Sequence, residues 1–484
     1  MYNNIHEECG VFGIYKPHNA DVAKTVYYGL NSLQHRGEEA AGIAVNKDRI
    51  IKCVKDLGLV SDVFDDGVFD TLGDGNMAIG HVRYSTSGNS TKVNAQPMLI
   101  KHIKGQMALA HNGNLTNSLE LREELEQKGC IFHTTSDTEV ISYIITGERL
   151  NSPSIEEAVT KAMYKIKGAY SLILMSPAKL IAARDPMGFK PLCMGEMSDG
   201  SIVFSSESCA FATIGAKFVR DILPGEIVVI ENGNIRTINE HIGRVSHSSM
   251  CLFEYIYFSR PDSILDGISA HDFRENAGRS LSIEHPVDAD IVIGVPDSGL
   301  EAARGFSKEA GIPYEIGLIK NKYVGRSFIA PDQGMRVDKV HMKLSSVSSV
   351  IKGKRVVLID DSIVRGTTSK QIVKMVRDAG AKEIHMRISS PPFLNPCYYG
   401  TDIDSKDNLI ACKYSLDEIR DYIGADSLGY LSVDAALSIL HKLSEKDYLE
   451  HDGMKVDRGY CTACFDGKYP TDIPKETDKL RFEI

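Results

Sequence analysis

The sequence predicts two domains: an α+β domain in the first half and an α/β domain with a parallel sheet in the second. A chain of 484 residues is long enough for two or three separately packed domains. Up to about residue 245, short apolar runs such as Gly10–Tyr15, Met77–Val82 and Leu172–Met175 are separated by Gly, Asn and Ser. Helical stretches such as Asp137–Thr146 lie between these runs, which is typical of sheets covered by helices.

From about Met250 the pattern changes to strands that alternate with helices. We expect strands at Ile291–Val295, Tyr314–Ile319, Arg355–Ile359 and Glu383–Ile388, and helices at Gly299–Glu309 and Ser369–Asp378. Short apolar strands in such an order indicate a parallel sheet that is buried on both faces. The polar residues Asn239–Ser249 are the expected linker between the two halves, and Ser415–Leu443 is expected to be helical.

Composition excludes several classes of protein. The formal net charge of -10 argues against general nucleic-acid binding, which needs a basic surface. The chain contains no apolar run of about 18 residues, so we expect no membrane span. The polar first residues lack the apolar core of a secretion signal, and we therefore expect a cytoplasmic protein. Five isolated cysteines are expected to be inert buried thiols: Cys53, Cys130, Cys193, Cys209 and Cys412.

Cys9 begins the run Cys-Gly-Val-Phe-Gly-Ile-Tyr, and its position alone favours an ordinary buried cysteine. Four further motifs follow in the same half: Gln34-His35-Arg36-Gly37, His81 to Thr86, His111-Asn112-Gly113-Asn114 and Ser136-Asp137-Thr138-Glu139. Together with Cys9 they resemble, in order and over residues 9–240, the class II glutamine amidotransferases. That resemblance implies the αββα sandwich of an N-terminal-nucleophile hydrolase.

In such a protein the cysteine thiol attacks the side-chain amide of glutamine and needs a base. A free α-amine on the same residue, with a pKa of about 8, can serve as that base. The resemblance therefore implies that Met1–Glu8 is a propeptide whose removal frees the amine of Cys9.

The resemblance also assigns the residues around the reacting amide. The Asn112 side chain and the Gly113 backbone N–H are expected to form an oxyanion hole. Arg83 is expected to bind the α-carboxylate of glutamine, Asp137 its α-ammonium, and Thr86 is expected in the loop that closes over the substrate.

A second motif lies where the predicted strand Arg355–Ile359 ends. The strand leads into Asp360 and Asp361, and a Gly-Thr-Thr loop then leads into a helix. Backbone N–H groups at a helix N-terminus bind phosphate, while an acidic pair accepts hydrogen bonds from ribose hydroxyls and holds Mg²⁺. The sequence therefore predicts a site for a sugar phosphate at the carboxyl end of the parallel strands.

This motif resembles that of the type I phosphoribosyltransferases. The resemblance implies that phosphoribosyl pyrophosphate (PRPP) binds at Asp360, Asp361, Arg365, Gly366, Thr367 and Thr368. Residues 295–299 resemble the pyrophosphate loop, with Ser298 next to the metal, so the expected Mg²⁺ ligands are Ser298, Asp360 and Asp361. Residues 320–326 resemble the start of a mobile catalytic loop, which would bring Tyr323 and Arg326 to the pyrophosphate.

Both halves together resemble the glutamine PRPP amidotransferases, which make 5-phosphoribosylamine at the start of purine synthesis. The resemblance implies inhibition by purine nucleotides and a homotetramer. One alternative is another class II amidotransferase, which would lack the motif at residues 360–368. The other is a non-catalytic PRPP sensor, which would lack the nucleophile and the mobile loop.

Four cysteines remain: Cys251, Cys397, Cys461 and Cys464. Their spacing alone is compatible with a [4Fe–4S] cluster, a structural zinc or a redox pair. Their sequence contexts resemble the iron–sulfur branch of the family, which implies a structural cluster. We therefore divide the chain into a propeptide (1–8), a glutaminase domain (9–245), a phosphoribosyltransferase domain (246–445) and a C-terminal segment with cluster ligands (446–484).

Overall fold

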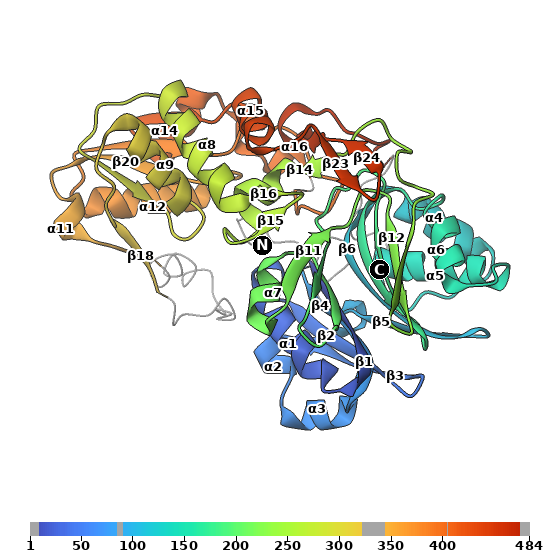
Figure 1. Cartoon of the computed structure of the whole chain (residues 1–484). Helices are drawn as coiled ribbons and strands as arrows, with labels where there is room; N and C mark the ends of the chain where they lie inside the picture. The colour runs from blue at the N-terminus through green and yellow to red at the C-terminus, as the bar shows by residue number, and fades with distance from the viewer. Residues whose placement is uncertain (1–8, 85–90, 322–343, 404, 475–484) are drawn as a thin grey trace.

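The computed structural model describes residues 9–84, 91–321, 344–403 and 405–474. In the first half, two antiparallel sheets face each other and helices cover both outer sides (Figure 1). The first sheet has the order β11-β9-β10-β1-β4-β2-β3. Its strands are β1 (Gly10–Ala20), β2 (Ala40–Lys47), β3 (Ile50–Leu57), β4 (Gly75–Arg83), β9 (Cys193–Glu196), β10 (Ile202–Ser205) and β11 (Lys217–Asp221).

The second sheet has the order β13-β12-β8-β7-β6-β5. Its strands are β5 (Met98–His102), β6 (Gly105–Leu115), β7 (Gly168–Met175), β8 (Lys179–Arg184), β12 (Ile227–Glu231) and β13 (Asn234–Ile238). The helices are α1 (Val22–Ser32), η1 (Gln34–Arg36), α2 (Val60–Val63), α3 (Asp66–Leu72), η2 (Lys92–Asn94), α4 (Ser118–Gln127), α5 (Asp137–Leu150), α6 (Ile155–Ala162) and α7 (Cys209–Ile214).

Three apolar cores lie between these layers. Along β1, Phe12 and Ile14 pack toward α1 and α7, whereas Val11 and Tyr15 pack toward the second sheet. This division follows from the alternation of side chains along a strand. A third core joins the second sheet to α4, α5 and α6. The predicted αββα sandwich is confirmed.

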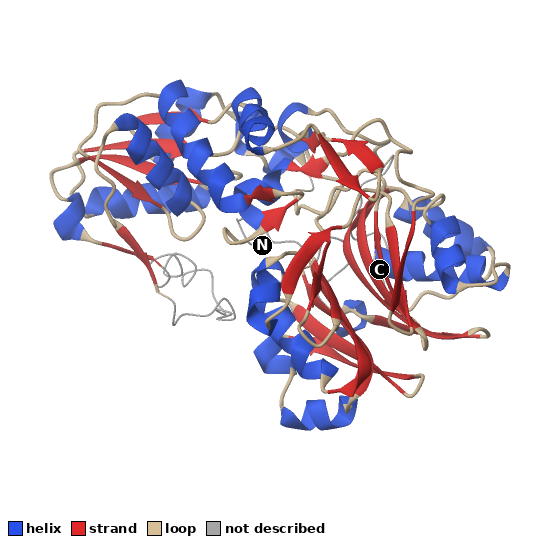
Figure 2. Ribbon diagram, in the orientation of Figure 1, coloured by secondary structure: helices blue, strands red, loops and turns tan. Residues whose placement is uncertain are grey.

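The second half contains a four-stranded parallel sheet with the order β17-β20-β21-β22. Helices lie on both sides of this sheet (Figure 2). Its strands are β17 (Ile291–Gly294), β20 (Arg355–Asp360), β21 (Glu383–Ile388) and β22 (Ser427–Tyr430). Helices α8 (Ala270–Glu284), α9 (Leu300–Ala310) and α15 (Val433–Leu443) contribute to the core on one face. Helices α12 (Thr367–Asp378) and α14 (Leu416–Ile423) contribute to the core on the other face. The predicted parallel-sheet domain is therefore confirmed.

Short elements complete this half. They are the π-helix η3 (Glu254–Phe258), the paired strands β15 (Ile264–Leu265) and β16 (Ile268–Ser269), the paired strands β18 (Leu318–Lys320) and β19 (Leu344–Ser346), and the short helices α11 (Ser348–Ile351), η4 (Lys406–Asn408) and α13 (Ile410–Lys413). No helix in the described ranges is long and apolar enough to cross a lipid bilayer.

The C-terminal segment packs back against the start of the second half. After the hairpin of β23 (Tyr448–His451) and β24 (Met454–Asp457), strand β25 (Tyr460–Cys461) pairs in parallel with β14 (Met250–Cys251), and α16 (Ala463–Asp466) follows. The division of the chain into four segments stays a prediction.

Two predicted elements differ from the structure. Residues 415–443 are not one helix. α14 ends at Ile423 and is capped by Gly424, whose φ of 80° is left-handed, and β22 then pairs with β21. The strand predicted at residues 314–319 forms only a single bridge from Tyr314 to Val292, and β18 starts at Leu318. In both regions the secondary structure depends on pairing with neighbouring strands rather than on local composition.

Helices α8 and α9 cross at glycines. A Cβ atom at Gly305 would lie 1.9 Å from the Glu275 carbonyl oxygen, and one at Gly278 would lie 1.8 Å from the Ala302 carbonyl oxygen. Such contacts are with rigid backbone, so neither helix can carry a larger residue here without moving.

We predict that Gly305→Ala lowers the melting temperature of the protein, because the clash costs about 1–3 kcal/mol and exceeds the gain in helix propensity. The matched control is Gly147→Ala in α5, where a Cβ atom would meet nothing within 4 Å. That variant is expected to stabilise by up to about 1 kcal/mol. Thermal unfolding followed by circular dichroism measures both, and equal shifts in the two variants would contradict the prediction.

Two candidate active sites

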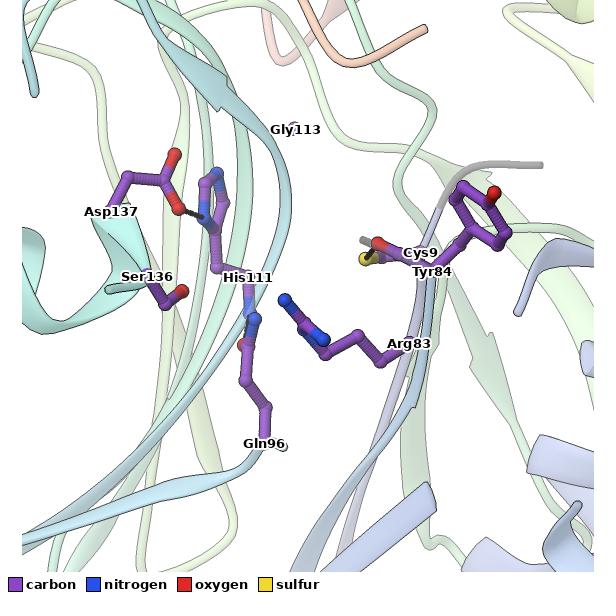
Figure 3. A pocket seen from close by; sticks show the side chains of 8 residues that line it. All are labelled: Cys9, Arg83, Tyr84, Gln96, His111, Gly113, Ser136 and Asp137. Carbon is purple, nitrogen blue, oxygen red and sulfur yellow. Dashed lines mark hydrogen bonds and ion pairs between the residues drawn. The ribbon is translucent and has the colours of Figure 1, made fainter. Parts of the chain in front are cut away.

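Cys9 lies directly before β1, with only 6% of its surface exposed, in a small recess between the two sheets of the first domain (Figure 3). Its thiol donates a hydrogen bond to the Tyr84 carbonyl oxygen at 3.4 Å. The recess is lined by Cys9, Arg83, Tyr84, Gln96, His111, Gly113, Ser136 and Asp137. The structure thus brings together four of the residues that the sequence assigned to glutamine chemistry: Cys9, Arg83, Gly113 and Asp137.

The Cys9 thiol is neutral at physiological pH in the uncleaved chain. Burial raises its pKa to about 11, which outweighs the hydrogen bond to Tyr84. Among the described residues, no histidine accepts a hydrogen bond from this thiol. The nearby His81 binds the His111 carbonyl oxygen instead, and burial lowers its pKa to about 3. The thiol therefore needs a base that no imidazole in its surroundings supplies.

Arg83 and Asp137 bring opposite charges to the recess from two elements. Arg83 ends β4, is almost fully buried, and its Nη1 lies 3.8 Å from a Glu39 carboxylate oxygen. Asp137 begins α5 and accepts a hydrogen bond from the Leu115 N–H at 3.0 Å. A guanidinium and a carboxylate that line one recess are suited to the two charges of an α-amino acid.

Asp137 is charged despite its burial. Burial pushes its pKa upward, but the imidazole of His111 and the Leu115 N–H outweigh that effect, and the pKa lies below the ordinary range. The His111 Nδ1 lies 3.5 Å from the Asp137 carboxylate. Asp137 can therefore attract an ammonium group at any pH near neutrality.

The two residues expected in the oxyanion hole differ in position. Gly113 lines the recess with a φ of 138°, and a Cβ atom there would lie 2.2 Å from the Ala169 carbonyl oxygen. Asn112 precedes it on β6 and does not line the recess, yet it is fully buried and neither side-chain polar atom has a partner. A buried amide without partners is costly, which is typical of a group that awaits a ligand.

The recess also includes residues that sequence reasoning had not assigned. His111 and Ser136 belong to the motifs at residues 111–114 and 136–139 but had no predicted role. In the structure they line the recess together with Gly113 and Asp137. Gln96 comes from an irregular stretch that carried no signal, and its side chain accepts a hydrogen bond from the His111 N–H at 2.7 Å. Thr86 and Met1–Glu8 lie outside the described residues.

The second candidate site lies at the carboxyl edge of the parallel sheet. β17 and β20 are neighbours, so the loop that holds Ser298 and the pair Asp360 and Asp361 emerge at the same edge. The Ser298 hydroxyl donates to an Asp361 carboxylate oxygen at 2.5 Å, and Ser362 does the same. The structure thus joins the three residues predicted to hold Mg²⁺.

Both carboxylates are buried and adjacent. Burial raises the pKa of Asp360 well above its usual range, and the Asp361 charge adds to the effect. Burial also raises the pKa of Asp361, against the lowering influence of the Ser298 and Ser362 hydroxyls. Two such groups hold negative charge at an energetic cost, which a bound cation or hydrogen-bond donors would offset.

The loop after the acidic pair leads into α12. Gly366 caps the helix with a φ of 77°, and a Cβ atom there would lie 2.6 Å from the Ile410 side chain. Arg365, Thr367 and Thr368 are half-buried around the helix N-terminus, where backbone N–H groups suit a phosphate. Tyr323 and Arg326 lie outside the described residues.

Comparison with known proteins matches a different domain family to each half of the chain. Residues 81–213 match the glutamine amidotransferase domain family, and residues 270–400 match the phosphoribosyl transferase domain family. The chain is 48% identical to the amidophosphoribosyltransferase of Methanocaldococcus jannaschii over 96% of this chain and 98% of that protein. The Bacillus subtilis amidophosphoribosyltransferase is 46% identical over 98% of this chain and 96% of its own length.

The chain belongs to the amidophosphoribosyltransferase family. It hydrolyses glutamine and transfers the ammonia to PRPP, which gives 5-phosphoribosylamine, glutamate and pyrophosphate in the first step of purine biosynthesis. Two solved structures resemble it closely. One is the allosteric regulatory enzyme of purine biosynthesis, with a TM-score of 0.88, 45% identity, and coverage of 97% of this chain and 98% of that one.

The other is the Bacillus subtilis glutamine PRPP amidotransferase in complex with ADP and GMP, with a TM-score of 0.87 and 45% identity. The match covers 97% of this chain and 99% of that one. The fold, the family and the reaction predicted from the sequence are therefore confirmed.

The four cysteines of the amidophosphoribosyltransferase chain that were predicted as cluster ligands lie near one another. Cys251 and Cys461 are paired neighbours on β14 and β25. Burial raises the pKa of Cys464 well above its usual range, and the nearby thiols of Cys397, Cys251 and Cys461 add to this. Among the described residues, however, no three His, Cys, Asp or Glu side chains are arranged to hold a metal ion.

Among the five isolated cysteines, Cys193 and Cys209 are buried as expected. Cys53 and Cys130 are only half-buried, and the prediction is wrong for Cys412, which is exposed on the short helix α13.

We predict that the Cys9 thiol reacts slowly with iodoacetamide in protein that retains residues 1–8. With a pKa of about 11, roughly a thousandth of the thiol is ionised at pH 8, so the rate should rise about tenfold per pH unit up to pH 11. Peptide mass spectrometry measures the rate, with the exposed Cys412 as the reference for reagent access. Fast alkylation that does not change between pH 7 and pH 10 would contradict the prediction.

Proposed function

We propose that Cys9 is the nucleophile for glutamine and that its own α-amine, released by removal of residues 1–8, is the base. The observation that carries the proposal is the recess that joins a buried thiol to Arg83 and Asp137. The lack of a histidine hydrogen bond to the thiol among the described residues supports the amine as base.

In this mechanism the Cys9 sulfur attacks the side-chain carbonyl carbon of glutamine while the α-amine takes the thiol proton. The carbon–nitrogen bond breaks, the nitrogen receives that proton, and ammonia leaves behind a γ-glutamyl thioester. Water then cleaves the thioester to glutamate and the free thiol. Arg83 and Asp137 hold the amino-acid end of the substrate, and Thr86 belongs to the loop proposed to close over it.

The oxyanion that forms in each attack needs donors. We assign the Gly113 N–H, which lies at the recess, and the Asn112 amide, whose buried polar atoms have no partner. Asn112 reaches the oxyanion only after a rotation of its side chain or a small shift of β6, because it does not line the recess in this structure.

For the second half-reaction we assign PRPP to the carboxyl edge of the parallel sheet. The N-terminus of α12 with Arg365, Gly366, Thr367 and Thr368 would hold the 5-phosphate, and Asp360 and Asp361 would accept from the ribose hydroxyls. Ammonia attacks C1 of the ribose, the bond from C1 to the pyrophosphate oxygen breaks, and pyrophosphate leaves. Tyr323 and Arg326 are proposed to contact that leaving group.

The residues at this edge fit Mg²⁺. Carboxylate and hydroxyl oxygens are its preferred ligands, and Ser298, Asp360 and Asp361 supply them from adjacent loops. When bound, Mg²⁺ would neutralise charge on the pyrophosphate. Burial raises the pKa of both Asp360 and Asp361, so a bound cation would stabilise their charged forms.

We further propose that the four clustered cysteines bind a [4Fe–4S] cluster. A zinc ion holds its sulfur ligands about 3.8 Å apart, as tetrahedral Zn–S bonds of about 2.3 Å require. No three metal-binding side chains of the described residues converge in that way, although Cys251, Cys397, Cys461 and Cys464 influence one another electrostatically. Four cysteine thiolates are the usual ligands of a four-iron cluster.

Regulation and assembly are also proposals. The Bacillus subtilis relative is known in complex with ADP and GMP, which supports inhibition of this chain by purine nucleotides. A homotetramer is proposed on the family resemblance, and a cytoplasmic location on the polar composition of the first residues.

Two variants separate the half-reactions. Cys9→Ser is expected to lower glutamine-dependent synthesis roughly 1,000-fold or more but to leave synthesis from PRPP and ammonium salts near the wild-type rate. Asp360→Asn is expected to lose both, because PRPP and its cation bind poorly. Phosphoribosylamine formation measured with each nitrogen source tests this, and full glutamine-dependent activity of Cys9→Ser would refute the proposed nucleophile.

The cluster proposal predicts that protein purified without oxygen is brown and contains about four iron and four sulfide per chain. Cys461→Ser is expected to lose both iron and colour, whereas Cys412→Ser, at an exposed cysteine outside the group, keeps them. Metal analysis and visible absorption are the measurements. A colourless protein that contains one zinc ion would overturn the proposal.

A further inference from the structure

Arg36 belongs to the motif Gln34-His35-Arg36-Gly37, for which the reaction described above has no role. It ends the short helix η1 and is 1% exposed. Its Nε donates a hydrogen bond to the carbonyl oxygen of Cys9 at 3.0 Å. The guanidinium does not line the glutamine recess, so it contacts the backbone of the nucleophile rather than the substrate.

Two carboxylates from different domains orient this guanidinium. Arg36 Nη1 donates to Glu207 at 2.6 Å and to Glu254 at 3.0 Å, and Nη2 donates to Glu254 at 2.7 Å. Glu207 follows β10 in the first domain, whereas Glu254 begins the π-helix η3 of the second. All three side chains are fully buried. A buried guanidinium with a two-pronged partner has one favoured orientation.

The second domain holds Glu254 firmly. The Ser259 hydroxyl donates to Glu254 at 2.9 Å, and the Lys190 ammonium lies 3.9 Å away. Arg274 of α8 fixes the rest of the π-helix, because its guanidinium donates to the carbonyl oxygens of Tyr255, Tyr257 and Ser259. Apart from Arg36 and Lys190, which belong to the first domain, the groups that hold Glu254 thus come from the second domain.

The same motif also touches the other side of the recess. A Cβ atom at Gly37 would lie 2.6 Å from the carbonyl carbon of Arg83, so the chain after Arg36 packs directly on the Arg83 backbone. The motif therefore lies against the backbones of both Cys9 and Arg83. A shift of Arg36 would move the thiol relative to the substrate carboxylate.

We propose that Arg36 is a positioning residue for Cys9 and that Glu254 makes the second domain a structural part of the glutamine site. The inference rests on the proposed role of Cys9 as nucleophile. The Arg36–Glu254 pair fixes the Cys9 carbonyl, and thereby the Cα from which both the attacking sulfur and the basic amine project. Misplacement of a reacting group by about 1 Å can cost on the order of 100-fold in rate.

The test compares two buried pairs that both join the domains. Glu254→Gln removes the charge that orients Arg36. Asp266→Asn is the matched control, because Asp266 binds Arg184 through both oxygens, at 2.8 and 3.0 Å, and with similar burial. The other hydrogen bonds of Arg184 go to Ile222, Gly188, Lys190 and Met250 rather than to Cys9.

Three quantities are measured for each two-domain variant after removal of residues 1–8. They are kcat and KM for glutamine hydrolysis, and the rate of phosphoribosylamine synthesis from PRPP and ammonium salts. For Glu254→Gln we expect kcat to fall about 10- to 100-fold, with KM for glutamine and the ammonium-dependent rate within about twofold of wild type. For Asp266→Asn we expect kcat within about threefold of wild type.

Arg36→Lys keeps the positive charge but loses the planar guanidinium, so it should lower kcat as much as Glu254→Gln does. The double variant Arg36→Lys/Glu254→Gln should have a kcat only slightly lower than that of either single variant. Equal loss of kcat in Glu254→Gln and Asp266→Asn, a parallel loss of ammonium-dependent synthesis, or an unchanged kcat in Glu254→Gln would each overturn the inference. If Cys9→Ser is inactive while Glu254→Gln is normal, only the positioning role fails. An active Cys9→Ser refutes the nucleophile itself.

Discussion

Buried arginines at the contact between the two domains constrain the whole molecule. Arg36 and Arg184 are both removed from water, and a guanidinium does not lose its proton to escape the cost. Each is matched by a carboxylate of the second domain, Glu254 or Asp266, so the domains have one favoured arrangement. The glutamine recess lies close to this contact, because Asn114, which follows Gly113 on β6, donates to the Tyr398 carbonyl oxygen at 3.1 Å.

The second site uses the opposite electrostatic arrangement. At the domain contact Arg36 and Arg184 each have a carboxylate partner. Asp360 and Asp361 instead lie side by side and accept hydrogen bonds from the Ser298 and Ser362 hydroxyls and from the Asp361 N–H. Burial raises the pKa of both carboxyls, so their charged forms cost free energy that a bound substrate and cation would offset. An acidic chain can bind a highly charged phosphate ester in this way, through local donors rather than a positive surface.

The sequence predicted what local patterns determine. Apolar runs marked β1, β4 and β20, and the Gly-Thr-Thr loop located the start of α12 to within two residues. Local patterns did not predict strand pairing between residues far apart in the sequence. β22 forms because it pairs with the edge of β21, whereas the strand expected at residues 314–319 makes only a single bridge to a neighbouring strand. The same holds for Arg36 and Glu254, which are separated by 218 positions, and no local pattern links them. Roles assigned to individual residues came from family resemblance, not from periodicity.

The central claim is that Cys9 carries the glutamyl group on a chain that begins at this residue. Acid-quenched protein, sampled during steady-state turnover of glutamine and PRPP, can be digested and analysed by mass spectrometry. The account predicts a γ-glutamyl thioester on a peptide whose first residue is Cys9 with a free α-amine. An adduct on another residue, or on a peptide that still contains Met1–Glu8, would contradict it.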